Sequence, residues 1–295
     1  MKKDFLSMDD ISMHEMVLLF RMAMALKKRP VQPMLRHKNL VLLFQKPSTR
    51  TMVSFEAGMN QLGGQAIHLN WNDIQLGRGE TIADTARVLS RYADGIMARL
   101  YAHKDIEELA RNADVPVING LTDLSHPCQA LSDMFTIAER FKRLSGLKMC
   151  FIGDGRDNVC YSLMQACHKA GMHMAIACPK GYEPGRQILS QTCKHVAVYD
   201  SPKPALKEAD VVYTDTWISM GEEKQRAQRL KDLSPYQLDS AKLRLAKPGA
   251  VVMHCLPAHR GQEITAEVID GPQSIVWDQA GNRLHVQKAL LAMMM

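Results

Sequence analysis

Short unbroken runs of apolar residues recur along the chain, and most are followed by apolar residues spaced three or four positions apart. The first run covers residues 40–44, and after Pro47 apolar positions repeat with helical spacing from Val53 to Leu62. An unbroken run is typical of a strand buried on both faces of a parallel sheet, whereas the wider spacing is typical of an amphipathic helix. The alternation continues through both halves of the chain and therefore predicts an α/β protein.

The elements that this pattern predicts are spread over the whole chain. Strands are expected at residues 40–44, 65–70, 95–101, 115–120, 148–152, 174–178, 209–217, 250–257 and 274–278. Helices are expected at residues 9–27, 48–62, 81–92, 126–141 and 185–193, after residue 158, and at residues 282–295. The charged run at residues 222–232 is typical of a mobile, solvated segment.

A chain of 295 residues exceeds the usual size of one hydrophobic core, so two domains are expected. We place them at residues 1–143 and 144–281, with the terminal helix 282–295 packing back on the first domain. The predicted fold is two doubly wound parallel-sheet domains. In such folds ligands bind beyond the carboxyl ends of the strands, so we expect the active site in the cleft between the domains.

Composition and charge narrow the class of protein. The net charge of +6 is modest and no long Lys/Arg run is present, which favours small anionic substrates over nucleic acid. Seven cysteines without a close pair are typical of free thiols in a reducing compartment. No run of about 18 apolar residues predicts a membrane span, and the first residues lack a signal-peptide core. A cytoplasmic protein without membrane contact is therefore expected.

The turn between the first strand and the next helix is the first candidate site. Ser48 and Thr49 are good helix N-caps, and Arg50 follows them directly. Free backbone N–H groups, hydroxyls and a guanidinium that converge at a helix N-terminus suit a phosphate dianion. An ordinary capped helix with a surface arginine is the alternative. Arg99, near the end of the strand 95–101, is a further candidate anion contact, although a lone arginine is more often solvated.

His126 precedes Pro127, which fits the first position of a helix, so His126 lies at or near the N-cap. The positive end of a helix favours neutral imidazole, which can donate one hydrogen bond to a carbonyl oxygen. The alternative is a histidine that caps its own helix. Gln129, one turn further on and on the same side, favours a polar site.

Cys255 and its neighbours suggest two rival chemistries. Cys255 could act as a nucleophile with His254 or His259, or the same residues could bind zinc. Adjacent side chains point to opposite faces of a strand, and no second ligand pair has zinc spacing. We therefore expect neither chemistry, and no metal.

Several motifs together resemble one family. Residues 47–56, Pro-Ser-Thr-Arg-Thr-x-x-Ser-Phe-Glu, are similar to the carbamoyl phosphate loop of the aspartate and ornithine carbamoyltransferases. Four further motifs follow in the family's order, at residues 126–129 (His-Pro-x-Gln), 215–221 (Asp-Thr-Trp-Ile-Ser-Met-Gly), 254–261 (His-Cys-Leu-Pro-Ala-His-Arg-Gly) and 282–283 (Asn-Arg). The resemblance thus spans nearly the whole chain.

The resemblance also indicates a branch of the family. Ser219-Met220-Gly221 and Cys255 are similar to the ornithine enzymes, whereas the aspartate enzymes carry a lysine in the loop that here contains Arg78. The implied reaction transfers the carbamoyl group of carbamoyl phosphate to the δ-amine of L-ornithine, giving L-citrulline for arginine metabolism. Putrescine or N-acylated ornithine as the acceptor is the alternative within the family. A non-catalytic member that acts as a binding partner is the alternative of another class.

The resemblance implies a role for each matching residue. Those implied to bind carbamoyl phosphate are Ser48, Thr49, Arg50, Thr51, Gln75, Arg99, His126, Gln129 and, on closure, Arg283. Those implied to bind ornithine are Asn158, Asp215, Ser219, Met220, Cys255 and Leu256. The implied catalytic residues are Arg50, Arg99, His126, Asp215 and Cys255. Gln75 is similar to a residue that such enzymes lend to an adjacent subunit, which implies a homotrimer or an assembly of trimers. No cofactor is implied.

Overall fold

The computed structural model describes residues 3–218 and 223–295, which form two compact units. The first unit consists of Met1–Phe135 and Asn282–Met295, and the second of Thr136–Gly281. Each unit is built on its own sheet, and every strand pairing within both sheets is parallel. The predicted class, two doubly wound parallel-sheet domains, is therefore confirmed. In the described part of the chain, no helix combines the length and apolar character needed to cross a bilayer.

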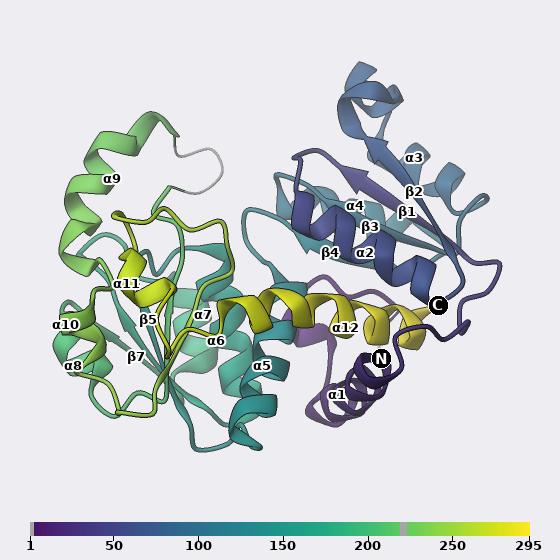
Figure 1. Cartoon of the computed structure of the whole chain (residues 1–295). Helices are drawn as coiled ribbons and strands as arrows, with labels where there is room; N and C mark the ends of the chain where they lie inside the picture. Colours follow the sequence, from purple (N-terminus) through teal and green to yellow (C-terminus); the bar gives the residue numbers. More distant parts are fainter. Residues whose placement is uncertain (1–2, 219–222) are drawn as a thin grey trace. The chain divides into compact units, whose positions relative to one another are not determined.

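The first unit contains a four-stranded sheet in the order β2-β1-β3-β4 (Figure 1). Its strands are β1 (Asn39–Phe44), β2 (Gln65–Asn70), β3 (Gly95–Arg99) and β4 (Val117–Leu121). The helices that begin in this unit are α1 (Met13–Lys28), α2 (Thr49–Gln61), α3 (Ile82–Leu89), α4 (His103–Asn112) and α5 (Pro127–Phe141), with short 3₁₀ helices at Met8–Asp10, Trp71–Asp73 and Gln75–Arg78.

Local sequence explains why these elements form. Ser12 caps α1, because its hydroxyl accepts from the Glu15 amide while the Glu15 carboxylate accepts from the Ser12 amide. The central strand β1 is buried on both faces. Val41 and Leu43 face a core that includes residues of α3 and α4, while Leu40 and Leu42 belong to the opposite face. The buried parallel strand predicted at residues 40–44 is thus confirmed.

The second unit contains a five-stranded sheet in the order β7-β6-β5-β8-β9. Its strands are β5 (Lys148–Ile152), β6 (His173–Ala177), β7 (Val196–Tyr199), β8 (Val211–Thr214) and β9 (Val251–Met253). Its helices are α6 (Asn158–Ala170), α7 (Arg186–Thr192), α8 (Pro202–Leu206), α9 (Arg226–Leu233), α10 (Ser240–Leu243) and α11 (Ala266–Ile269), with 3₁₀ turns at Glu223–Gln225 and Ser234–Tyr236. Asp157 caps α6 by accepting from the amides of Val159 and Cys160.

The last helix, α12 (Val276–Met294), completes the first unit with its residues from Asn282 onward. Lys288 is fully buried, and its ammonium donates to the carbonyls of Leu26 and Pro30 and to Oε1 of Gln61. Lys27 of α1 donates to Asn282 over 2.8 Å. The end of the chain is therefore fastened to α1 and α2, near which α12 passes in Figure 1.

Two predicted segments have a different structure. Residues 274–278 do not form a strand, because Ser274 makes only an isolated bridge to Val252 and α12 begins at Val276. The charged run at 222–232 is not simply a solvated segment, since it contains most of α9, whose Arg229 is only 1% exposed. Sequence reasoning also missed β7 and α4.

Candidate active site

The turn after β1 carries the predicted phosphate residues of the first unit. Ser48 is the N-cap of α2, and its hydroxyl accepts from the Thr51 amide at 3.4 Å. Arg99 ends β3, where it pairs in register with Phe44 at the end of β1. The end of β3, which carries Arg99, and the N-terminus of α2 therefore lie at the same edge of the sheet, formed by the carboxyl ends of the strands. α/β proteins bind ligands at this edge.

Arg283 links two of the other predicted residues. It is 4% exposed, and its guanidinium donates to Thr51 Oγ1 at 2.9 Å and to Gln129 Oε1 at 2.7 Å. The amide of Gln129 in turn donates to Asp133 at 2.8 Å. These bonds fix which end of the Gln129 side chain is oxygen and which is nitrogen. Thr51, Gln129 and Arg283 thus form one connected polar group.

His126 is the residue on which the charges of this unit converge. It is buried, and its pKa is well below the usual 6.5, first because burial disfavours imidazolium and then because of the positive charges of Arg283, Arg99 and Arg50. His126 is therefore neutral at physiological pH, the form that its place at the helix end predicted. The main cause is burial among cations rather than the helix end alone.

The other predicted residues of this unit are more accessible. Ser48, Arg50 and Arg99 are half-buried, whereas Thr49 and Gln75 are exposed. Gln75 begins a 3₁₀ helix within residues 71–80, a segment that extends beyond β2 in Figure 1. Among the described residues, no hydrogen bond joins the Gln75 side chain to the other residues predicted to bind carbamoyl phosphate. The structure therefore does not bring Gln75 together with those residues within one chain.

Asp215 and Cys255 meet in the second unit. Asp215 follows β8 directly, Cys255 lies two residues after β9, and the thiol donates to Asp215 Oδ1 at 3.0 Å. The two strands are neighbours in the sheet, so their carboxyl ends bring together residues 40 positions apart in the sequence. The juxtaposition rests on sheet order rather than on local sequence.

The carboxylates of Asp215 and Asp157 make the site in the second unit electrostatically negative. The pKa of Asp215 is raised well above its usual 3.8, first by burial and then by the negative charge of Asp157; the Cys255 thiol and the Thr216 amide oppose the shift. A buried carboxylate beside a second one favours binding a cation, because the cation restores the charged form. An amino acid's ammonium group is a suitable cation.

His254 organises the turn that carries Cys255. Its Nδ1 accepts from the Leu256 amide at 2.9 Å, so the ring proton of the neutral form is on Nε2, which lies 3.2 Å from Glu263 Oε1. The backbone amide of His254 donates to Gln279. Both ring nitrogens of His254 are thereby engaged within the unit.

This geometry corrects the argument used against a zinc or nucleophile site. His254 and Cys255 follow β9 rather than lying in it, and ligand atoms of Asp215, His254 and Cys255 lie within 4.8 Å of one another. They do not point to opposite faces. A metal ion would nevertheless compete with the Leu256 and Glu263 bonds of His254, and the Cys255 thiol donates to a carboxylate rather than to an imidazole. The donor set therefore fits a hydrogen-bonded turn better than a metal centre or a Cys-His nucleophile.

The remaining residues predicted to bind ornithine differ in burial and in backbone conformation. Asn158 is half-buried at the start of α6, directly after Asp157. Leu256 has a φ of 59° and packs against the core of the second unit. Ser219 and Met220 lie outside the described residues.

Sequence reasoning missed three acidic residues of these groups. The charge of Asp157 acts on Asp215, the Glu263 carboxylate lies next to the His254 ring, and Asp133 accepts a hydrogen bond from Gln129. Asp157 could have been found, because an aspartate between a Gly-x-Gly turn and a helix is a typical N-cap. No local signal identifies Glu263, which is fully buried nine residues after its partner.

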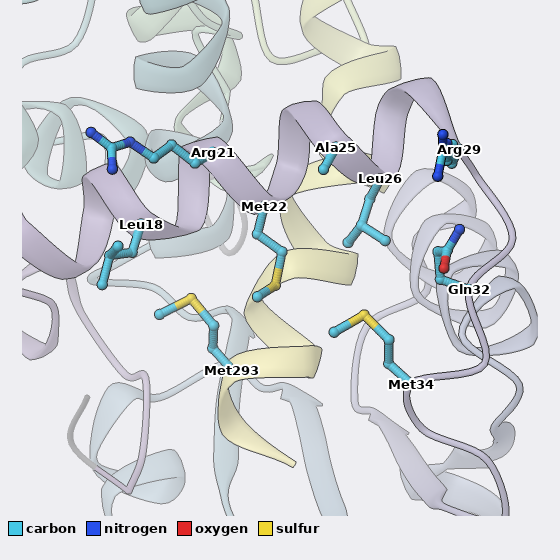
Figure 2. Close-up of a pocket in the computed structure, with 9 residues that line it drawn as sticks. All are labelled: Leu18, Arg21, Met22, Ala25, Leu26, Arg29, Gln32, Met34 and Met293. Atoms are coloured by element: carbon cyan, nitrogen blue, oxygen red, sulfur yellow. The ribbon is translucent and has the colours of Figure 1, made fainter.

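A hollow of about 680 Å³ in the first unit lies apart from these residues. Its walls include Leu18, Met22 and Leu26 of α1 together with Met34 and Met293 (Figure 2). None of the predicted site residues lines it.

Two parallel α/β units, one with an arginine-rich helix N-terminus and one with paired buried carboxylates, define a protein that can hold an anion in one unit and an amine in the other. The model of the aspartate/ornithine carbamoyltransferase carbamoyl-P binding domain matches residues 3–139, and that of the Asp/Orn binding domain matches residues 145–294. The chain belongs to the aspartate/ornithine carbamoyltransferase family.

Full-length relatives agree with this assignment. The chain is 54% identical to the ornithine carbamoyltransferase of Methanoculleus marisnigri over 99% of this chain and 96% of the relative. It is 49% identical to that of Bacillus anthracis over 98% and 93%. The solved ornithine carbamoyltransferase structure from Pyrococcus furiosus matches with a TM-score of 0.94 at 49% identity, covering 99% of this chain and 96% of that chain. The one from Thermus thermophilus matches with a TM-score of 0.93 at 40% identity, covering 100% and 99%.

Proposed function

We propose that the protein transfers the carbamoyl group of carbamoyl phosphate to the δ-amine of L-ornithine, producing L-citrulline and phosphate. The observation that carries the proposal is the convergence of the Arg50, Arg99 and Arg283 charges on the buried, neutral His126 of the first unit. The names of the relatives and solved structures, all ornithine carbamoyltransferases, support the same acceptor.

The first unit supplies the groups for carbamoyl phosphate. Ser48, Thr49, Arg50 and Thr51 hold the phosphate at the N-terminus of α2, with Arg99 and Arg283 as further donors. Neutral His126 and Gln129 hold the carbamoyl group. When the amine attacks the carbonyl carbon, negative charge develops on the carbonyl oxygen. A hydrogen-bond donor at that position lowers the barrier by roughly 3 kcal/mol. Phosphate leaves with its charge already paired to arginine, so protonation of the leaving group is not required.

The second unit supplies the groups for ornithine. Asp215 and Cys255 form a hydrogen-bonded pair that can accept from and orient an amine, and Asn158, Leu256, Ser219 and Met220 complete the proposed set. The δ-amine must lose its proton before it attacks. Binding of the cationic ammonium of the same substrate beside Asp215 and Asp157 offsets the repulsion between these carboxylates.

The acceptor is tested by measuring carbamoylated product with ornithine, putrescine and N-acetylornithine side by side, each with carbamoyl phosphate. We expect a kcat/KM for ornithine at least about a hundredfold above the others, because N-acetylornithine lacks the α-ammonium and putrescine lacks the α-carboxylate. A site built to bind a charged group rejects a substrate that lacks it. A preference for putrescine or the acetylated compound would replace ornithine as the acceptor. No product from any of the three would favour a non-catalytic binding role.

We also propose that the protein is a cytoplasmic homotrimer in which Gln75 contributes to the site of an adjacent subunit. The exposed position of Gln75 on a segment extending beyond β2 supports this proposal. Mixing the inactive variants Gln75→Ala and Arg50→Ala under exchange conditions should restore part of the activity, because some hybrid sites contain neither substitution. Light scattering gives the subunit number. A monomer, or a mixture without recovered activity, would contradict the shared site.

A further inference from the structure

Arg229 is a buried arginine in a helix whose other long polar side chains are exposed. It is 1% exposed, whereas Arg226, Gln228 and Lys231 of the same helix α9 are exposed. A guanidinium is buried in a folded protein only where charged and polar partners replace its hydration. The partners of Arg229 therefore indicate what the residue holds in place.

Those partners come from two other segments of the second unit. The Nε of Arg229 donates to the Trp217 carbonyl at 2.7 Å, and Nη2 donates to Oδ2 of Asp154, itself a buried carboxylate. One planar guanidinium thus joins the chain leaving β5 to the chain leaving β8. Lysine could not reproduce this arrangement, because its ammonium is a point charge without the fixed fork of donors.

Tyr182 covers the same group from another side. The guanidinium carbon of Arg229 lies 5.3 Å from the Tyr182 ring centroid, and that of Arg156 lies 4.5 Å from it. The Tyr182 hydroxyl donates to Asp232 of α9 at 3.1 Å. A Cβ at Gly155 would lie 2.8 Å from the Tyr182 carbonyl, so the turn that carries Asp154 packs directly against this segment.

The two joined segments carry the carboxylates proposed for ornithine. Asp154 lies three residues before Asp157, and Trp217 lies two residues after Asp215. Both carboxylates are buried, and the negative charge of Asp157 adds to the effect of burial, which is the first cause of the raised pKa of Asp215. Arg229 binds the Trp217 carbonyl of one segment and the Asp154 carboxylate of the other. It therefore holds together the two segments that carry these like charges.

We propose that Arg229 is a positioning residue for amino-acid binding, acting through Asp154 and the Trp217 carbonyl on the placement of Asp157, Asn158 and Asp215. The inference rests on the proposed function, because it assigns these residues to ornithine. The chemistry of carbamoyl phosphate in the first unit needs no help from Arg229. Its loss should therefore change the use of one substrate and not of the other.

The test compares Arg229→Gln with Arg226→Gln, which makes the same change at an exposed position of α9. Citrulline formation is measured with each substrate varied in turn, beside the melting temperature. For Arg229→Gln we expect the KM for ornithine to rise at least about tenfold while the KM for carbamoyl phosphate stays within about twofold. Asp154→Asn should act in the same direction, and the double variant should be less impaired than the product of the two effects. Arg226→Gln should behave as the wild type.

The alternative outcomes are distinct. A lower melting temperature with both KM values unchanged, or raised equally, would make Arg229 merely structural and overturn the inference. If Arg229→Gln does not fold, Arg229→Lys is judged by the same two KM values. A wild type and an Arg226→Gln variant that both form no citrulline would overturn the proposed function, and the inference with it. If the wild type and Arg226→Gln both form citrulline but Arg229→Gln shows no selective rise in the ornithine KM, the inference is overturned and the proposed function stands.

Discussion

Arg283 donates hydrogen bonds to Thr51 and Gln129, although it follows them in the sequence by 232 and 154 positions. Family resemblance implied that this arginine joins the phosphate site only on closure. In this structure it already contacts two of the residues predicted for that site. The last helix is therefore part of the proposed anion site and not only of the core of the first unit.

Arg283→Lys tests this role. Lysine keeps the charge but cannot donate along the two directions of the guanidinium fork, so one of Thr51 and Gln129 loses its donor. We expect the KM for carbamoyl phosphate to rise about tenfold, the equivalent of roughly 1.4 kcal/mol, with the ornithine KM nearly unchanged. Arg111→Lys, at an exposed position of α4, is the matched control. Equal changes in both KM values would exclude a role specific to carbamoyl phosphate.

Arg50→Ala should lower kcat/KM by at least about a hundredfold, because it removes a donor at the position where charge develops. The fold should be retained, since Arg50 is half-buried at the first turn of α2. Steady-state citrulline assays and thermal melting measure both effects. Arg91→Ala, at an exposed arginine of the same unit, should change neither. A variant as fast as the wild type would remove the phosphate assignment of the turn.

Asp215→Asn should weaken ornithine binding and stabilise the fold. The folded-state pKa of Asp215 is raised above 3.8, so its stabilising contribution is complete below that pH and is lost as the pH rises through the folded pKa. At pH 7.5 the buried charge is therefore unfavourable, and asparagine removes it. We expect a melting temperature several degrees higher at pH 7.5, a difference that shrinks near pH 4, and a rise of roughly 10- to 100-fold in the ornithine KM. A lower melting temperature at pH 7.5 would contradict the assigned cause.

His126 should stay neutral down to a pH clearly below 6.5. Its folded-state pKa is lowered by burial and by three arginines, so its contribution to stability is complete above 6.5 and decreases as the pH falls toward the folded pKa. Nitrogen-15 NMR of histidine-labelled protein measures the titration, and His126→Gln identifies the signal. An imidazole that protonates at or above pH 6.5 would contradict both assigned causes, the burial of the ring and the nearby charges of the three guanidiniums.

Lys288→Met should destabilise the first unit without altering catalysis. The substitution leaves the Leu26 and Pro30 carbonyls and Gln61 Oε1 without their common donor, at a cost of roughly 2–3 kcal/mol. Hydrogen exchange in α1 and α12, together with denaturant unfolding, measures the loss. Lys28→Met, at an exposed position of α1, is the control. Unchanged exchange in both helices would show that the buried ammonium does not hold them together.

The fold could largely be predicted because buried parallel strands have a strong local signature. The strand predicted at residues 40–44 from its apolar run alone is observed at Asn39–Phe44, one residue longer. Residues 274–278 also contain a short apolar run, at residues 275–277, but α12 begins within them at Val276. There Trp277 is 63% exposed, and only Ser274 bridges to the sheet. Apolar composition does not distinguish a strand from a first helical turn when the neighbouring chain decides the outcome.

The candidate site was less predictable because many of its relationships are long-range. Arg229 lies in a charged run, and such runs are usually solvated. Its burial could not be predicted locally, because its partner Asp154 lies 75 positions away in the sequence. The contact between Cys255 and Asp215 depends on β8 and β9 being neighbours, which no local pattern specifies. Family motifs identified which residues to consider, whereas partners such as Asp157 and Glu263 emerged only from the folded structure.

The fastening of α12 by Lys288 affects the order in which the protein can fold during synthesis. Residues 282–295 are translated after the whole of the second unit, yet they belong to the unit whose other residues precede it. While the second unit is being translated, the N-terminal segment lacks both Lys288 and Arg283. Its apolar surface and its proposed anion-binding turn are completed only after the second unit has been translated, so of the two units the one that is begun first is completed last.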